Sequence, residues 1–270
     1  MKLKSVYFLL AVFALCAMLV GSSYAEISPG DIIGIWFLNE IVGGVAKDSS
    51  GNGHDGEIIG DLEVVNAKFG KGFEFDGVLG NYVSVPHDES LNLAEFTITY
   101  WCNMGISGSW QIPVLKVDGA TSGAHRNVDF QTPPEGGEVS VYFSQGANQW
   151  RGAIGTTVVS DEEWHHIAGS YDLDRLLLYV DGVLEGEGDH DGEPDFVDDP
   201  LMLGSGEIWP FLGIIDDVGI FNKALSADDI VNIMNSGLDK ALSITAVSSA
   251  GKLTATWGGI KRRCRELYLQ

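Results

Sequence analysis

The chain has few basic residues, and this shortage limits the partners it can have. It contains 16 Lys and Arg residues against 38 Asp and Glu residues, which gives a net charge of −22 at pH 7. Binding to nucleic acid or to anionic membrane surfaces requires clustered cations that neutralise phosphates. We therefore expect neither partner. The acidic excess favours solubility outside the cell, and it also supplies ligands for divalent cations.

Cysteine is scarce, with three residues in the chain: Cys16, Cys102 and Cys264. This number excludes a cysteine-rich zinc site. Cys102 follows Tyr100 and Trp101 in a strand-like run, which predicts a buried thiol. Export would permit a disulfide between Cys102 and Cys264, and the sequence leaves that pairing open because geometry decides it.

Long apolar runs are absent after residue 25, so we expect no later segment to span a bilayer as a helix. At the N-terminus, Lys2 and Lys4 precede the apolar run Val6–Val20, and the small residues Ser23 and Ala25 stand three residues and one residue before Glu26. The run is shorter than the roughly 20 residues that cross a membrane. Residues 1–25 are therefore predicted to be a signal peptide, and the protein to be secreted, periplasmic or in the cell envelope.

Short β-type runs recur between turn signals through residues 26–238, which we expect to form one domain. In the most informative block, Trp164–Gly182, turn residues at Asp172–Asp174 separate two runs that are typical of antiparallel strands. This rhythm indicates a β-sandwich. The expected strands are Ile32–Leu38, Gly72–Asp76, Tyr82–Val85, Phe96–Cys102, Val139–Phe143, Trp164–Tyr171, Leu176–Val180 and Leu212–Phe221.

One helix is expected near the end of this domain. Ser226 is placed to cap it with Asp229 three residues later, Ile230 and Ile233 supply an apolar face, and Gly237 ends it. After it, residues 239–270 form a basic tail in which Ser243–Trp257 alternates as a small hairpin would. The purpose of this tail is not predicted.

A series of motifs follows one another along the chain in a specific order and spacing. They are Trp36, Asp48–Gly56, Phe69–Gly70, Phe73–Gly77, Tyr82–Pro86, Phe96–Ile98 with Trp101, Trp164–Gly182, Leu203–Gly204, Gly213–Val218 and Ala224–Ser226. Together they resemble the LamG-like jelly-roll domains of the concanavalin A-like lectin/glucanase superfamily. The resemblance implies an all-β fold, a two-sheet antiparallel jelly-roll sandwich with one short C-terminal helix. Binding modules, lectins and hydrolases share this fold, so it does not decide activity.

The resemblance also implies a structural calcium ion that joins an early loop to the last strand. The loop Asp48–Gly56 is rich in oxygen ligands and bent by glycines, as calcium sites are. The expected ligands are Asp48, Asn52 and Asp217, because Asp216 and Asp217 would point in opposite directions from a regular strand. The alternative is a tight turn held by Asx hydrogen bonds without a metal.

A second acidic segment, residues 185–199, has acids spaced partly as in an EF-hand loop, with Gly192 at the glycine position. The spacing suggests one interpretation, a second and weak calcium loop with the ligands Glu187, Asp189, Asp191 and Glu193. A Glu at the first position and Asp198 at the last depart from that motif. The favoured interpretation is a solvated loop between two strands.

Catalytic groups are hard to find in this sequence. Glucanases of this fold carry two carboxylates on one face of one strand. The nearest approaches here are Glu57 with Glu63, which Gly60 interrupts, and Asp161–Glu163, which precedes a strand. His165 and His166 are adjacent in a strand and therefore face opposite ways, which favours packing roles over metal binding.

Tryptophans near loops are the candidate ligand-binding residues. Trp110, Trp150 and Trp209 lie near loop segments, where an exposed ring can stack on a sugar or simply cover an edge of the core. The function predicted is an exported, non-catalytic module that binds a glycan or an extracellular protein and carries calcium. The alternatives are a divergent glucanase-like hydrolase and a structural adhesion or envelope protein.

Overall fold

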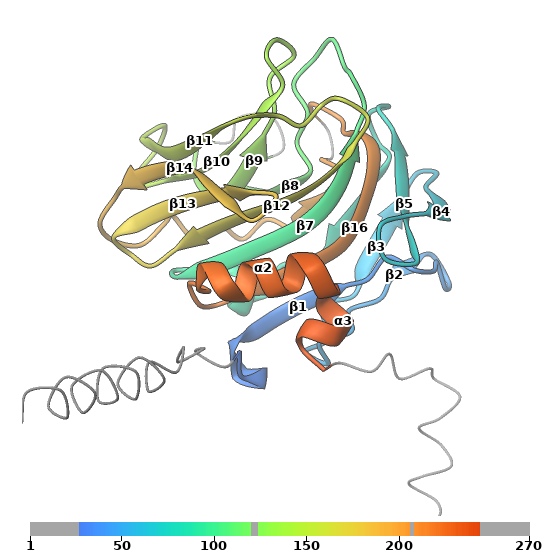
Figure 1. The fold of residues 1–270 in the computed structure, drawn as a ribbon, viewed down its shortest axis with the longest axis horizontal. Helices are drawn as coiled ribbons and strands as arrows, with labels where there is room; N and C mark the ends of the chain where they lie inside the picture. The colour runs from blue at the N-terminus through green and yellow to red at the C-terminus, as the bar shows by residue number, and fades with distance from the viewer. Residues whose placement is uncertain (1–26, 120–123, 206–207, 244–270) are drawn as a thin grey trace, which may run out of the picture.

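The computed structural model describes residues 27–119, 124–205 and 208–243, and within them the chain forms two antiparallel β-sheets followed by two helices (Figure 1). The predicted fold class is confirmed. The strands are β1 (Ile32–Trp36), β2 (Val45–Ala46), β3 (Gly56–Ile59), β4 (Glu63–Asn66), β5 (Lys71–Asp76), β6 (Tyr82–Val85), β7 (Phe96–Met104), β8 (Val114–Val117), β9 (Arg126–Gln131), β10 (Glu138–Ser144), β11 (Trp150–Val158), β12 (Trp164–Tyr171), β13 (Arg175–Val180), β14 (Val183–Asp189), β15 (Leu201–Leu203) and β16 (Leu212–Phe221). The helices are the short 3₁₀ turns η1 (Pro29–Asp31) and η2 (Glu89–Leu91), and α2 (Ala227–Ser236) and α3 (Leu238–Ala241).

The two sheets are interleaved in sequence, as in a jelly roll. Sheet A has the order β14-β13-β12-β7-β16-β5-β4, with β1 paired to β16. Sheet B has the order β11-β10-β9-β8-β15-β6-β3-β2. All eight strands expected from the sequence are present. The additional strands, which are β2, β3, β4, β8, β9, β11, β14 and β15, are short, fully buried or interrupted by glycines and acids, so they lack a clear apolar alternation.

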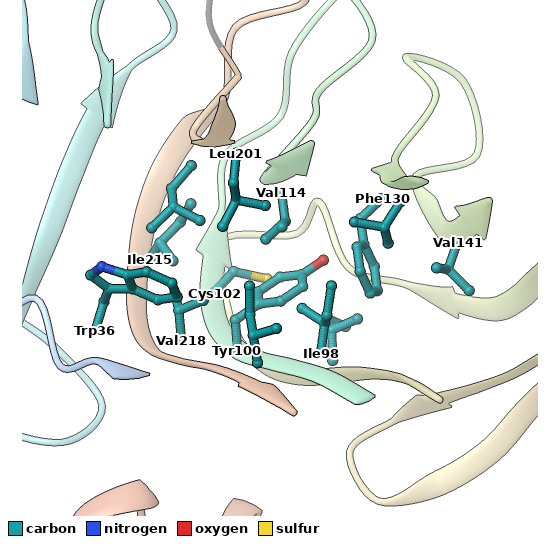
Figure 2. Packing of buried hydrophobic residues seen from close by; sticks show 14 of the residues in the cluster. Trp36, Ile98, Tyr100, Cys102, Val114, Phe130, Val141, Leu201, Ile215 and Val218 are labelled. Carbon is teal, nitrogen blue, oxygen red and sulfur yellow. The ribbon is translucent and has the colours of Figure 1, made fainter. Parts of the chain in front are cut away.

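The core lies between the sheets and is filled by the side chains that point inward from the strands of both sheets (Figure 2). Tyr100 from sheet A packs edge-on against Phe130 from sheet B, with ring centroids 5.3 Å apart. Cys102 lies in the same layer with no exposed surface, and burial raises the pKa of its thiol. The prediction of a buried thiol at Cys102 is confirmed, whereas its pairing with Cys264 lies outside the described residues.

Helix α2 begins where the sequence predicts. Ser226 Oγ accepts a hydrogen bond from Asp229 N, and the Asp229 carboxylate accepts one from Ser226 N. Ile230 and Ile233 then pack on the outer face of sheet A, along which α2 lies in Figure 1. The short helix α3 was not predicted, and it crosses the expected boundary at residue 238. The hairpin expected over 243–257 lies, after Ser243, outside the described residues.

The segment predicted as an acidic loop is a strand over its first part. Glu185–Asp189 belongs to β14, the edge of sheet A, which lies against β11, the edge of sheet B. Glycines make this approach possible, because a Cβ on Gly186 would lie 2.6 Å from the carbonyl oxygen of Ile154. Glu185 joins the same edges by accepting hydrogen bonds from the backbone N–H groups of Thr156 and Thr157. The glycines therefore allow contact between the two sheets, and the loop begins only at His190.

Candidate functional site

Trp150 lies on the outer face of sheet B, at the first position of β11. A hairpin places it there, because Gln149 N donates to Gly146 O and Gln145 N donates to Gln149 O. Gly146 and Asn148 take the left-handed backbone conformations that this turn needs. The register then sets Trp150 opposite Ser144 of β10.

An aromatic neighbour lies on the same face of the sheet. Tyr142 is opposite Gly152, so it is the diagonal neighbour of Trp150, and such neighbours lie about 7–8 Å apart with their Cβ atoms somewhat closer. The alternation of β10 turns Val141 and Phe143 into the core and Tyr142 outward. Tyr142 is half-buried and Trp150 is 47% exposed. The two rings therefore form a partly open aromatic surface.

A buried arginine fixes one side of the Trp150 ring. The guanidinium carbon of Arg126 lies 4.2 Å from the ring centroid, in cation–π contact. The Arg126 side chain is 4% exposed and forms an ion pair with Asp129, which is fully buried. Burial lowers the pKa of Arg126, and the neighbouring Tyr142 and Asp118 oppose that shift. Because Arg126 covers one ring face, the open area of Trp150 lies on its other face and edges.

Trp110 and Trp209 lie at the opposite end of β9. Gln111 joins their loops, because its side-chain oxygen accepts from Leu212 N at 2.9 Å and its side-chain nitrogen donates to Gly105 O at 2.8 Å. The backbone of Gln111 pairs with Thr132. The extended chain from Arg126 to Thr132 spans about 20 Å, at roughly 3.3 Å per residue.

The structure therefore joins the loops that carry Trp110 and Trp209 through Gln111, and places Trp150 apart from them, at the start of β11. Trp110 and Trp209 are 39% and 38% exposed. Trp209 has a φ of 49°, an unusual value for a non-glycine residue. Strand patterns also predict three core tryptophans, of which Trp36 and Trp101 are buried and Trp164, the first residue of β12, is only half-buried.

The Asp48 carboxylate organises the loop Asp48–Gly56 through hydrogen bonds from the chain. Its Oδ1 accepts from the backbone N–H groups of Ile35 and Ser50, and its Oδ2 accepts from those of Gly53 and His54 and from the Ser50 hydroxyl. A carboxylate has about four lone-pair positions, so these five donors fill it. This is the arrangement of a tight turn held by its aspartate.

The other two expected calcium ligands are likewise engaged. Asn52 donates both amide protons to the carbonyl oxygens of Ile32 and Ile33. Asp217 accepts a hydrogen bond from Leu238 N, at the start of α3. Among the described residues no three His, Cys, Asp or Glu side chains form a metal-binding group. In this structure Asp48 and Asp217 each accept hydrogen bonds from the chain, and calcium remains a prediction for experiment.

Asp216 and Asp217 point to different partners, as expected from their adjacency. A β-bulge follows Asp216, and Asp217 takes a φ of 48° within it. Asp216 accepts a hydrogen bond from Phe69 N at 2.7 Å, and its second oxygen has no partner among the described residues. Burial raises the pKa of Asp216 to about 8 and that of Asp217 to about 6.

Asp216 is one of three buried side chains that lie side by side on adjacent strands, on the outer face of sheet A. It is opposite Trp101, which is in turn opposite His166. His166 Nε2 lies 2.6 Å from Thr99 Oγ1, and burial lowers the pKa of His166 to about 3. His165 instead lies between Asp181 and Asp161, so the two histidines face opposite ways as predicted.

The remaining carboxylates named from the sequence are dispersed. Glu57 is on β3 of sheet B and Glu63 on β4 of sheet A, while Asp161–Glu163 forms a turn before β12. The residues predicted to form a second calcium loop are likewise divided between a strand and a loop. Of its four expected ligands, Glu187 and Asp189 lie on strand β14, whereas Asp191 and Glu193 lie in the loop that follows.

Sequence reasoning missed Arg126 and Tyr142. Tyr142 carries a usable signal, since it alternates with Val141 and Phe143 in a run already predicted as a strand. Arg126 carries none, because its contact with Trp150 depends on the pairing of three strands across sheet B.

Comparisons with known proteins agree with this architecture. Residues 76–231, more than half of the chain, match the family model described as the concanavalin A-like lectin/glucanases superfamily. No curated protein sequence matches the chain.

Solved structures with this fold include several binding domains. The binding domain of Paraclostridial Mosquitocidal Protein 1 is 16% identical, with a TM-score of 0.63 over 77% of this chain and 52% of that one. The botulinum neurotoxin serotype D binding domain is 15% identical, with a TM-score of 0.61 over 77% and 51%. Domain 4 of AbnA, a GH43 extracellular arabinanase from Geobacillus stearothermophilus in complex with arabinotriose, is 19% identical, with a TM-score of 0.61 over 76% and 98%.

This chain thus spans about half the length of the two toxin binding domains and nearly all of the arabinanase domain. At these identities the similarity shows a shared fold and leaves ligands to be determined. The sandwich topology and the family match lead to one conclusion: the chain belongs to the concanavalin A-like lectin/glucanases superfamily.

Proposed function

We propose that the chain is an exported, non-catalytic binding module that recognises a glycan on the outer face of sheet B around Trp150. The observation that carries this proposal is the fixed, half-open ring of Trp150, stacked on Arg126 at 4.2 Å. An aromatic face attracts the positively polarised C–H groups of a pyranose, and a ring held in place loses little entropy on binding. The neighbouring Tyr142 supplies a hydroxyl that can donate to or accept from a sugar hydroxyl.

The similar structures support this choice of ligand class. The arabinanase domain was solved with arabinotriose, and the shared fold covers 98% of that domain. Calcium remains a separate prediction, and the proposed recognition does not depend on it. Among the described residues, no helix is long and apolar enough to cross a membrane.

A glycan array tests the proposal directly. The wild-type protein is expected to bind a defined set of glycans, Trp150→Ala to lose them, and Trp209→Ala to retain them as the matched control. A blank array for the wild type, together with binding to an envelope protein, would instead favour the adhesion class.

The proposed export is tested separately, by locating the N-terminus of the secreted protein. Residues 1–25 carry the features of a signal peptide, so the secreted protein is expected to begin at Glu26. N-terminal sequencing of protein recovered from outside the cytoplasm checks this cleavage, and an uncleaved Met1 start would contradict it.

A further inference from the structure

A cavity of about 340 Å³ opens beside the edge of β1 that no strand of the described chain pairs with. This volume is at the lower end of the range of small-molecule sites, about 300–1,000 Å³. It shares no residue with the surface around Trp150. Its apolar wall includes Pro29 and Ile33, and its polar side chains are Asn52, His54, Asp88 and Ser90.

The hydrogen bonds at Ser90 fix where the protons are. Ser90 Oγ lies 2.6 Å from Asp88 Oδ1 and 3.0 Å from His54 Nε2. The hydrogen bonds from Ser90 lower the pKa of Asp88, and an ionised carboxylate only accepts, so the single hydroxyl proton goes to Asp88. His54 Nε2 must then donate to Ser90 Oγ. His54 is therefore unable to act as a general base toward Ser90, which excludes a serine nucleophile activated by this pair.

Two acceptor atoms remain open at the cavity. Asn52 uses both amide protons on the carbonyl oxygens of Ile32 and Ile33, at 2.8 and 2.9 Å, which fixes the orientation of the amide. Its Oδ1 has no hydrogen bond with any described residue, and neither has Asp88 Oδ2. Both residues are exposed, so these oxygens are accessible to a ligand.

The polar side chains of the cavity thus offer a ligand hydrogen-bond acceptors, while their donor protons named above are already used in hydrogen bonds within the chain. The hydroxyl proton of Ser90, both amide protons of Asn52 and the Nε2 proton of His54 are all used within the chain. What remains is the oxygen of Asn52, the second oxygen of Asp88, a lone pair on Ser90 and one negative charge.

We propose that this cavity binds a protonated primary amine carried on a short apolar stem. An ammonium group brings three donors, no acceptor and a positive charge, which match the open oxygens and the carboxylate of Asp88. Methylene groups of the stem pack against Pro29, the exposed apolar side chain of the lining. Calcium fits less well, because it takes 6–8 oxygen ligands and these side chains offer about three.

NMR titration of the full chain tests the proposal, with the side-chain amide of Asn52 and the backbone amide of Ser90 as reporters. Butylammonium chloride is expected to shift both signals to saturation, while butanol, which has the same stem without the charge, and sodium chloride leave them unchanged. An equal response to butanol, or no saturable response to the amine, overturns the proposal. Saturation by calcium chloride with loss of the amine response also overturns it.

Paired variants test the role of the charge. Asp88→Asn keeps a side chain that caps η2 and is expected to weaken amine binding by about tenfold, because it removes the negative charge with which the ammonium group pairs. Glu89→Gln removes the same charge from the next residue, outside the cavity, and is expected to bind as wild type does. Equal weakening in both variants would show general surface charge and overturn the proposal.

A lysine side chain carries its amine on such a stem, whereas an amino sugar carries it directly on the ring. The proposal therefore predicts tighter binding of the lysine compound, and two arms compare these sources. Glucosamine and Nα-acetyl-lysine amide are each compared with the counterpart whose amine is acetylated. Acetylation of the amine is expected to abolish the binding of whichever compound binds. The compound with the lower Kd identifies the source of the amine. Binding that survives acetylation in both arms contradicts the proposal.

Discussion

Arg126 of β9 stacks its guanidinium 4.2 Å from the ring centroid of Trp150, the first residue of β11. The two residues are on strands separated by β10, so the contact crosses sheet B. Asp129 completes the arrangement by pairing with Arg126 in a fully buried position. The ion pair fixes Arg126, and Arg126 in turn fixes one face of the Trp150 ring. The ring is 47% exposed, so its other face is accessible to a ligand.

Breaking that ion pair is expected to destabilise the protein strongly. Arg126→Met leaves the buried carboxylate of Asp129 without its cation, which costs roughly 3–5 kcal/mol. Urea unfolding of the variant measures this loss. The double variant with Asp129→Asn is expected to recover most of the stability, and a double variant as unstable as Arg126→Met would contradict an ion-pair role.

Asp216 is expected to make stability fall as pH rises. Its pKa is raised by burial to about 8 in the folded protein, whereas the unfolded chain loses this proton near pH 4. Between pH 7 and 8 the folded state therefore binds a proton that the unfolded state does not. The free energy of unfolding falls in this window by up to about 1.4 kcal/mol per pH unit and levels off above the folded pKa.

The variant Asp216→Asn isolates this effect, because the amide mimics the protonated carboxyl. His166, with a pKa of about 3 in the fold, is neutral there, and the small charge that the unfolded histidine keeps near pH 7 is the same in wild type and variant, so it cancels in the comparison. Chemical unfolding from pH 7 to 8.5 should give a flatter profile for the variant and a higher stability at pH 8.5. Parallel profiles would refute the raised pKa.

Gly186 is expected to be essential for contact between the two sheets. A methyl group there would lie 2.6 Å from Ile154 O and 2.8 Å from Ile154 N, both backbone atoms of β11. Gly186→Ala should cost about 1–3 kcal/mol, measured by thermal unfolding. Gly108→Ala is the matched control, because no atom lies within 4 Å of the added Cβ, and equal losses in both variants would contradict the steric explanation.

Asp48 is expected to stabilise the fold by accepting five hydrogen bonds, with or without calcium. Asp48→Ala leaves those donors without an acceptor and should cost roughly 3 kcal/mol or more. The Tm of wild type and variant is measured in excess calcium and in EDTA. A calcium-dependent rise in Tm that requires Asp48 would contradict the metal-free turn and support the calcium site expected from the sequence.

The sequence predicts the fold well because strands and caps leave local patterns. Trp164–Tyr171 and Leu212–Phe221 have the predicted bounds, and Ser226 with Asp229 marks the start of α2. Strand β14 was missed because glycines replace its apolar residues, and their purpose depends on a distant strand. Only the structure shows that Gly186 faces β11.

The candidate site was predictable only in part. Trp150 was identified as a loop tryptophan, and its partner Arg126 could not be, since their contact depends on strand register. The calcium predicted at Asp48 stays a prediction. Asp48 has the chemistry of a calcium ligand, and in this structure its oxygens accept four hydrogen bonds from its own loop and one from Ile35 N of β1.

The most direct test of glycan recognition is isothermal titration of the best glycan from the array against wild type, Trp150→Ala and Trp209→Ala. The proposal predicts that Trp150→Ala raises the Kd about tenfold or more, equivalent to roughly 1.4 kcal/mol, while Trp209→Ala leaves it unchanged. An unchanged Kd for Trp150→Ala, with the fold intact by circular dichroism, would contradict the proposed site.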